Sequence, residues 1–170
     1  MEKEIPTILD LENIKDNQDQ MKLLNLLAPL VETMTSRLLI THLNSRDKLD
    51  LRLNSFVWGY LNSLAYGHAE RCSISTRNQK VLRTVSASLH SILFNNSVAI
   101  SELEYQSVYE SIKNIKTLKD EFVEGTKACD ADIPKIGIDA PLRNSLLPSL
   151  NIFLHKKIKE FEPYKKAKDK

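Results

Sequence analysis

The sequence predicts an all-α fold, a single-domain antiparallel bundle of about five helices whose first and last long helices are kinked. Three observations predict it. Apolar residues recur at spacings of three and four along most of the chain, which is the period of a helix. Four Gly and six Pro in 170 residues give too few turn signals for a β-sandwich. Residues 53–69 and 84–101 contain no Asp, Glu, Lys or Arg, although 27% of the chain is charged.

The two charge-free stretches predict two buried helices. At this composition a surface helix should meet a charged residue about every four positions. A domain of this size can enclose about one central helix, so a second buried helix indicates that two copies of the chain join their central helices across a two-fold axis. Aromatic residues are expected to carry that interface, namely Phe56, Trp58, Tyr60 and Tyr66.

The first long helix is expected over residues 19–43, preceded by an N-terminal arm or short helix over residues 1–16. Leucines recur along one face of this helix at spacings of three and four. Pro29 lies inside the pattern and lacks an amide donor, so we expect a kink there or a break just before it.

The second helix is expected to begin at Asn44 or Ser45 and to end near Arg71. Residues 49–53 alternate apolar and polar side chains, which would also suit a short strand, but the pattern then changes to threes and fours. Gly59 and Gly67 each cost about 1 kcal/mol relative to Ala in a helix. We therefore expect another backbone to approach closely at these two glycines.

The third helix is expected to begin at Ser73 or Ser75 and to end near Asn95 and Asn96. Residues 101–104, Ser-Glu-Leu-Glu, form a capping box that predicts the start of the fourth helix. Gly125 is placed to end that helix.

The last helix is expected after an irregular segment over residues 125–140. Asp139 followed by Pro141 is a good helix start, and Pro148 predicts a bend. The helical domain therefore spans residues 17–162, and residues 163–170 form a lysine-rich flexible tail.

Composition argues against several classes of protein. Both charge-free stretches contain Asn, Ser and His and fall short of the roughly 18 consecutive apolar residues of a membrane span, so no membrane partner is expected. The acidic N-terminus lacks an apolar core segment, and Cys72 and Cys129 are expected to be reduced thiols of a cytoplasmic protein.

His68 and Cys72 share a helix face, but no further ligand pattern completes a zinc site. No catalytic residue, metal, cofactor or small-molecule substrate is inferred.

A basic segment around the connection of the two charge-free helices indicates possible contact with nucleic acid. Residues 69–75, Ala-Glu-Arg-Cys-Ser-Ile-Ser, resemble the turn of a helix-turn-helix motif, although Cys72 and Ser73 replace its usual Leu and Gly. The resemblance implies a recognition helix carrying Arg77, Asn78 and Lys80. The residues of a nucleic-acid surface would then be Arg71, Arg77, Lys80, Arg83 and His90, together with the lysine tail.

Two Arg–His pairs have a spacing of four to six intervening residues, namely Arg37 with His42 and Arg83 with His90. This spacing resembles the signature of HEPN ribonucleases, which are helical bundles that dimerise around paired Arg and His. The resemblance implies that an Arg steadies a phosphate while a His moves a proton. Arg83 and His90 are expected on one helix face, opposite the apolar stripe of that helix.

The preferred interpretation is a non-enzymatic helical protein-interaction or regulatory module. Its partner would be another protein or a second copy of the chain in a homo-oligomer. A nucleic-acid-binding regulator that uses Arg71 to Arg83 and the lysine tail is the alternative, and a HEPN-like ribonuclease is a third.

Overall fold

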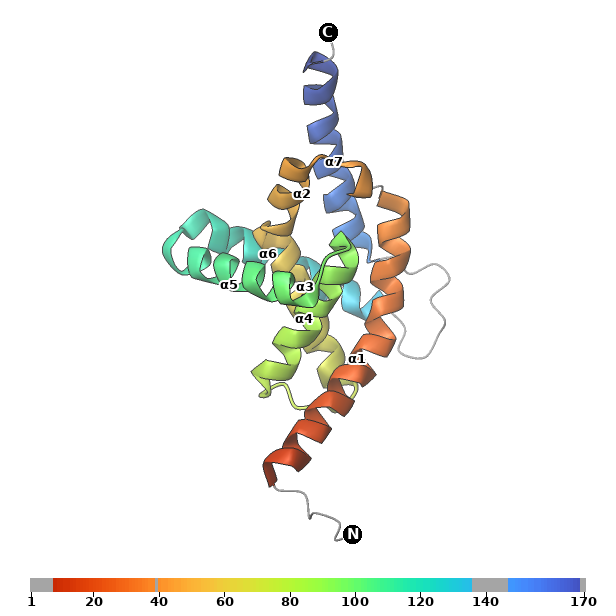
Figure 1. Cartoon of the computed structure of the whole chain (residues 1–170), viewed down its shortest axis with the longest axis vertical. Coiled ribbons are helices and arrows are strands. Elements are labelled where there is room, and N and C mark those ends of the chain that lie inside the picture. The colour runs from red at the N-terminus through yellow and green to blue at the C-terminus, as the bar shows by residue number, and fades with distance from the viewer. Residues whose placement is uncertain (1–7, 39, 136–146, 169–170) are drawn as a thin grey trace.

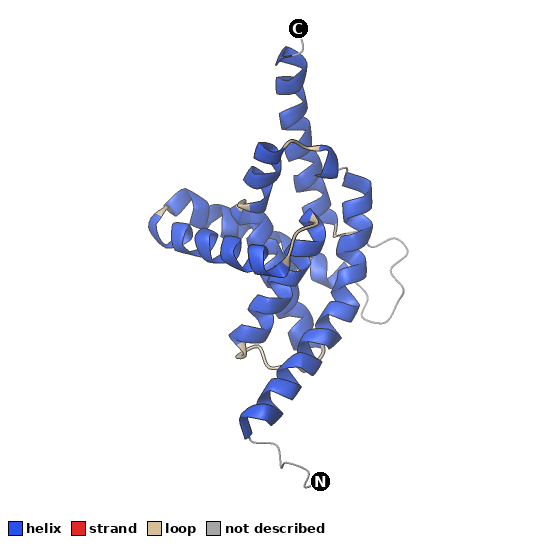
Figure 2. Ribbon diagram, in the orientation of Figure 1, coloured by secondary structure: helices blue, strands red, loops and turns tan. Residues whose placement is uncertain are grey.

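Every regular element of the described chain is a helix (Figure 1 and Figure 2). The computed structural model describes residues 8–38, 40–135 and 147–168, without the side chains of residues 8–11, 36, 37, 41 and 162–168. The all-α prediction is confirmed, with seven α-helices and two short 3-10 helices in these ranges. The elements are α1 (Ile8–Leu38), η1 (Ile40–His42), α2 (Ser45–Arg52), α3 (Ser55–Arg71), α4 (Gln79–Phe94), α5 (Val98–Asn114), α6 (Lys116–Asp132), η2 (Ile133–Lys135) and α7 (Pro148–Lys168).

Helix α3 lies at the centre of the molecule. It packs along α6 and against α4, and α4 packs in turn along α1 and α5 (Figure 1). The side chains of Trp58, Tyr60 and Leu64 on α3 are fully buried, as are those of Val85 and Leu89 on α4. The prediction that the charge-free stretches form buried helices is therefore confirmed for most of α3 and α4. Both helices are covered within one chain.

Helices α3 and α6 cross in direct backbone contact. A Cβ atom added at Gly59 would lie 2.1 Å from the carbonyl oxygen of Phe122, and one added at Gly125 would lie 2.1 Å from that of Phe56. Only a residue without a side chain fits at either position. The expected close backbone approach is confirmed at Gly59, whereas the close neighbour of Gly67 is the side chain of Ile133.

The expected second helix is two helices, because the chain turns at Leu53 and Asn54. The Asn54 side chain accepts a hydrogen bond from the backbone N–H of Val57 at 3.2 Å and so caps α3. The indole N–H of Trp58 donates to the carbonyl oxygen of Arg52 at 2.9 Å, which satisfies the end of α2. The strand alternative for residues 49–53 is wrong, since α2 extends to Arg52.

The expected fourth helix is also two helices, α5 and α6. The prediction that the capping box at residues 101–104 starts a helix is wrong, because these residues lie inside α5. Helix α5 begins four residues earlier, at Val98, because Ser97 rather than Ser101 is its cap and accepts the hydrogen bond from the backbone N–H of Ile100. It ends at Asn114, and α6 begins at Lys116. Gly125 does not end a helix but lies inside α6, so residues 125–132 are helical rather than irregular.

Helix α4 begins later than expected. Asn78 caps it, and Ser73 instead adopts a left-handed backbone conformation (φ 56°) in the connection from α3. Its expected end is confirmed at Asn95, which is left-handed as well (φ 52°). The Asn78 side chain also donates to Asp16 at 2.7 Å, which joins this connection to α1.

Pro29 and Pro148 lie at different places in their helices. Helix α1 runs from Ile8 across the expected boundary at residue 16 and continues through Pro29 to Leu38. The expected bend at Pro148 is wrong, because Pro148 is the first residue of α7, where a missing amide donor costs nothing. Asp139 and Pro141 lie outside the described residues. No helix in the described ranges is long and apolar enough to cross a membrane.

Candidate binding cleft beside helices α4 and α5

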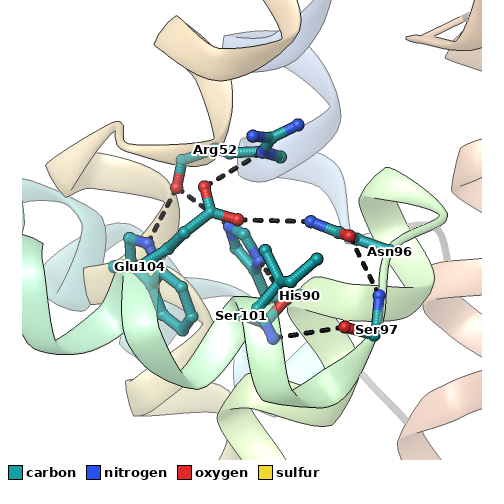
Figure 3. A network of polar contacts seen from close by, with 8 residues as sticks. Arg52, His90, Asn96, Ser97, Ser101 and Glu104 are labelled. Atoms are coloured by element: carbon teal, nitrogen blue, oxygen red, sulfur yellow. Dashed lines mark hydrogen bonds and ion pairs between the residues drawn. The ribbon is translucent and has the colours of Figure 1, made fainter.

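A buried polar network holds α5 against the rest of the bundle, and His90 lies at its centre (Figure 3). The Nε2 atom of His90 lies 2.9 Å from the carbonyl oxygen of Arg52, and its Nδ1 atom lies 2.9 Å from the hydroxyl oxygen of Ser101. Because a carbonyl oxygen can only accept, Nε2 carries the proton and the Ser101 hydroxyl donates to Nδ1. The imidazole also stacks on the Trp58 ring at 4.0 Å.

Burial lowers the pKa of His90 to about 3. Near neutral pH the ring is therefore uncharged, and both of its nitrogen atoms already have hydrogen-bond partners. No face of the ring reaches the surface, since the residue is fully buried. This geometry gives His90 a structural role and no route for moving a substrate's proton. His90 lies on the same helix face as Arg83, opposite the apolar stripe as expected, but this face is buried at His90 against α3 and α5.

An ion pair completes the network at its edge (Figure 3). Arg52 donates from Nε to Glu104 Oε2 at 2.9 Å, and the Asn96 side chain donates to Glu104 Oε1 at 3.3 Å. These bonds join α2, the connection after α4, and α5. These bonds hold the N-terminal half of α5 in place, and this half forms one wall of a neighbouring cleft.

The cleft consists of two adjoining hollows of about 320 Å³ and 670 Å³, on the surface between α3, α4, α5 and α6. Gln79, Arg83 and Tyr105 line both hollows. The smaller is lined in addition by Asn62, Ser63, Tyr66, Leu82, Thr126 and Asp130. The larger is lined in addition by Lys80, Thr84, Glu102, Gln106, Tyr109, Glu110 and Lys113.

Tyr105 lies where the two hollows meet. Its hydroxyl accepts a hydrogen bond from the Asn62 side chain at 3.2 Å, and its ring lies edge-on to the buried Trp58 ring at 5.1 Å. The guanidinium carbon of Arg83 lies 5.4 Å from the centre of the Tyr105 ring, a cation–π contact. Tyr105 therefore couples the surface of the cleft to the buried network.

Tyr109 extends this aromatic surface by one helical turn. Its ring is nearly parallel to that of Tyr105, with 6.0 Å between centroids and 14° between planes. The Lys113 ammonium lies 4.8 Å from the centre of the Tyr109 ring and 3.3 Å from Glu110. Tyr109 is 42% exposed, so much of its ring faces solvent.

Two cations in the cleft lack a carboxylate partner. Among the described residues, neither Lys80 nor Arg83 lies within ion-pair distance of an Asp or Glu side chain. Of the carboxylates that line the cleft, Glu110 pairs with Lys113, and Asp130 accepts a hydrogen bond from the neutral Ser63 hydroxyl at 2.5 Å. The two cations without a carboxylate partner lie on α4, whereas Glu102 and Asp130 lie opposite them on α5 and α6.

The structure separates the residues expected to form an aromatic interface. Trp58 and Tyr60 are fully buried, and the Tyr60 hydroxyl donates to Asp132 at 2.8 Å. Phe56 is half-buried and stacks on Phe153 at 4.1 Å. An interface through Trp58 and Tyr60 is wrong, because neither ring reaches the surface. Tyr66 alone of the four is exposed, and self-association through other residues stays a prediction.

The residues expected to contact nucleic acid are also divided. Lys80 and Arg83 line the cleft, whereas Arg77 is exposed in the connection before α4 and is not among the residues that line it. Arg71 is half-buried and donates to the carbonyl oxygen of Ile133 at 3.1 Å. The side chains of Arg37 and of residues 163–170 lie outside the described residues. Of the described residues in this set, Lys80 and Arg83 line the cleft together.

His68 on α3 and Cys129 on α6 are also buried within the bundle. His68 Nδ1 lies 3.2 Å from the carbonyl oxygen of Leu64, and burial lowers the pKa of His68. Burial also raises the pKa of the Cys129 thiol to about 12. In the part of the chain that the structure describes, no three His, Cys, Asp or Glu side chains are grouped to hold a metal ion.

No protein-family model, curated protein or solved structure matches this chain. The site is therefore defined by its geometry. Sequence reasoning missed Tyr105 and Tyr109, although the spacing of Tyr105, Tyr109 and Lys113 at intervals of four marks one helix face. That periodicity was the available signal.

Proposed function

We propose that this chain is a non-enzymatic protein-interaction module, regulatory in role, which receives a segment of a partner protein in the cleft beside α4 and α5. One observation carries the proposal. The cleft combines Tyr66, Tyr105 and Tyr109 with two cations that have no carboxylate partner among the described residues. Tyrosine and arginine are the side chains that most often dominate the binding energy of protein interfaces.

The surroundings of the reactive side chains support a binding role over a catalytic one. His90 and His68 are buried and hydrogen-bonded, and their lowered pKa values keep both rings neutral. The Cys129 thiol is buried with a raised pKa, which opposes formation of a nucleophilic thiolate. Ser63 lines the smaller hollow and donates its hydroxyl hydrogen bond to Asp130, and no histidine is among the described residues that line either hollow.

Affinity capture with matched variants tests this proposal. Tyr109→Ser removes an exposed ring from the cleft, and Leu103→Ser removes a more exposed apolar side chain (68%) from the same helix outside the cleft. The wild-type chain and Leu103→Ser should retain the same protein from an extract of the source cells, and Tyr109→Ser should lose it. Retention by all three chains would contradict the proposal, as would equal loss in both variants.

Binding of single-stranded nucleic acid is the second candidate. The observation that favours it is the near-parallel pair Tyr105 and Tyr109 beside Arg83 and Lys80, because bases stack on aromatic rings and phosphates pair with cations. It predicts a mobility shift of a single-stranded oligonucleotide that weakens steeply as salt is added. Absence of a shift at low salt would remove this candidate.

A further inference from the structure

We infer that the partner segment bound in the cleft carries a carboxylate side chain next to an aromatic side chain. The carboxylate would pair with Arg83, and the aromatic ring would pack on Tyr105 and Tyr109. This inference rests on the proposed function and names the chemistry of the partner at the same site. Three features of the cleft carry it.

The first feature is the position of Arg83. Its guanidinium group is held at the junction of the two hollows by the contact with Tyr105, and no described carboxylate lies within ion-pair distance. A guanidinium group can donate two parallel hydrogen bonds to a carboxylate, and such charged bonds are stronger than neutral ones. A planar acid therefore matches the free donors of Arg83.

The second feature is the small amount of unpaired positive charge. Lys80 and Arg83 are the cations of the cleft without a carboxylate partner among the described residues, since Lys113 pairs with Glu110. Glu102 in the larger hollow and Asp130 in the smaller one oppose them, so the cations and carboxylates that line the cleft balance in number. A polynucleotide gains its affinity by neutralising several phosphates in a row. The balance of charge in this cleft instead fits an isolated acidic group, which favours a peptide over a nucleic acid.

The third feature is the exposed aromatic surface next to Arg83. The nearly parallel rings of Tyr105 and Tyr109 present a surface one helical turn long, and Tyr66 lies 45% exposed in the smaller hollow. Aromatic pairs gain about 0.5–1.5 kcal/mol beyond the area that they bury. An aromatic side chain beside the acid would use this surface.

Three probes titrated into the ¹⁵N-labelled full chain test the inference. They are the peptide Gly-Glu-Trp-Glu-Gly, its neutral match Gly-Gln-Trp-Gln-Gly, and a single-stranded oligothymidine. The acidic peptide should shift the amide resonances of α4 and α5 around the cleft and bind about tenfold more tightly than the neutral peptide. Arg83→Gln should abolish that difference. Arg77→Gln, which changes an exposed arginine outside the cleft, should preserve it.

Equal affinity for the two peptides would overturn the inference, and so would a preference that survives Arg83→Gln. Tighter binding of oligothymidine that displaces the acidic peptide would assign the cleft to nucleic acid instead. The acidic peptide could fail to bind while the Tyr109→Ser variant still loses a captured protein. In that case the inferred carboxylate of the partner is wrong, and the proposed function stands. If capture is also independent of Tyr109, both are wrong.

Discussion

Single residues in this protein show how burial decides chemistry. His90 has the spacing from Arg83 that resembles a ribonuclease signature, yet its ring points into the core, stacks on Trp58 and uses both nitrogen atoms for hydrogen bonds. Arg83 from the same pair stays at the surface against Tyr105. Sequence spacing places residues around a helix, but the partners offered by other helices determine which side is covered.

The buried His90 predicts a specific dependence of stability on pH. In the unfolded chain this histidine titrates near 6.5, whereas in the folded chain its pKa is about 3. Between these values the unfolded state binds the extra proton, so stability is fully present above 6.5 and is lost as pH falls toward 3. Urea unfolding from about pH 7 to about pH 5 should show His90 contributing a loss of about 2 kcal/mol.

The variant His90→Gln lacks this titration, so its free energy of unfolding should fall less over the same pH range than that of the wild-type chain. His155→Gln, an exposed histidine of α7, is the matched control and should follow the wild type. An identical fall in His90→Gln and wild type would contradict the structural role of the neutral ring.

Asp132 predicts a second effect at the residue scale. Its buried carboxylate accepts hydrogen bonds from the Tyr60 hydroxyl and from both the backbone N–H and the hydroxyl of Ser149, each at 2.8 Å. Asp132→Ala removes the acceptor of all three bonds, which leaves buried donors unpaired at a cost of about 1–3 kcal/mol. Urea denaturation should show this loss, and Asp120→Ala on the exposed part of α6 should be close to neutral. Equal stability of the two variants would be inconsistent with the described bonds.

At the scale of elements, the close crossing of α3 and α6 predicts that Gly125→Ala lowers the stability of the fold. Helix propensity alone would give Gly125→Ala a gain of about 1 kcal/mol. The added Cβ would instead meet the Phe56 carbonyl and force the helices apart, so we expect a loss of roughly 1–3 kcal/mol. Lys127→Ala, an exposed position on α6, serves as the control in the same urea titration. A stabilised Gly125→Ala variant would refute the close crossing.

Apolar periodicity predicted the helical class and the core faces, but it could not predict where helices break. Leu53 and Asn54 interrupt a pattern that continues through α2 and α3, and the break depends on the Asn54 cap and on the Trp58 bond to Arg52. The Trp58 bond forms only when α2 and α3 fold against each other, whereas the Asn54 cap is local to the start of α3. Gly125 was misread for the same reason, since a glycine that ends a helix and one that admits a neighbouring backbone look alike in sequence.

The cleft was only partly predictable for a related reason. Tyr66, Lys80 and Arg83 were identified from the sequence as candidate binding residues, but for two different functions. The α5 residues that complete the cleft come from a helix whose position is set by the buried network of His90, Ser101 and Glu104. Such long-range polar contacts leave no periodic signal along the chain.

At the scale of the whole molecule, the buried interior and the proposed binding surface are separate. The charge-free stretches of α3 and α4 are buried inside one chain, because these helices pack against α1, α6 and each other. The surface between α3, α4 and α5 carries Tyr66, Tyr105 and Tyr109 and the two cations that have no carboxylate partner among the described residues. Self-association is therefore not needed to cover Trp58 or Tyr60, and a partner is expected at the cleft.

Amide hydrogen exchange of the free chain, measured in dilute and in concentrated solution, tests this separation most directly. If α3 and α4 are covered by their own chain, their amides should exchange slowly and at the same rate in both solutions, because only global unfolding exposes them. Protection of residues 57–65 that falls on dilution would show that a second copy covers α3, and would contradict the assignment of these helices to the interior of a single chain.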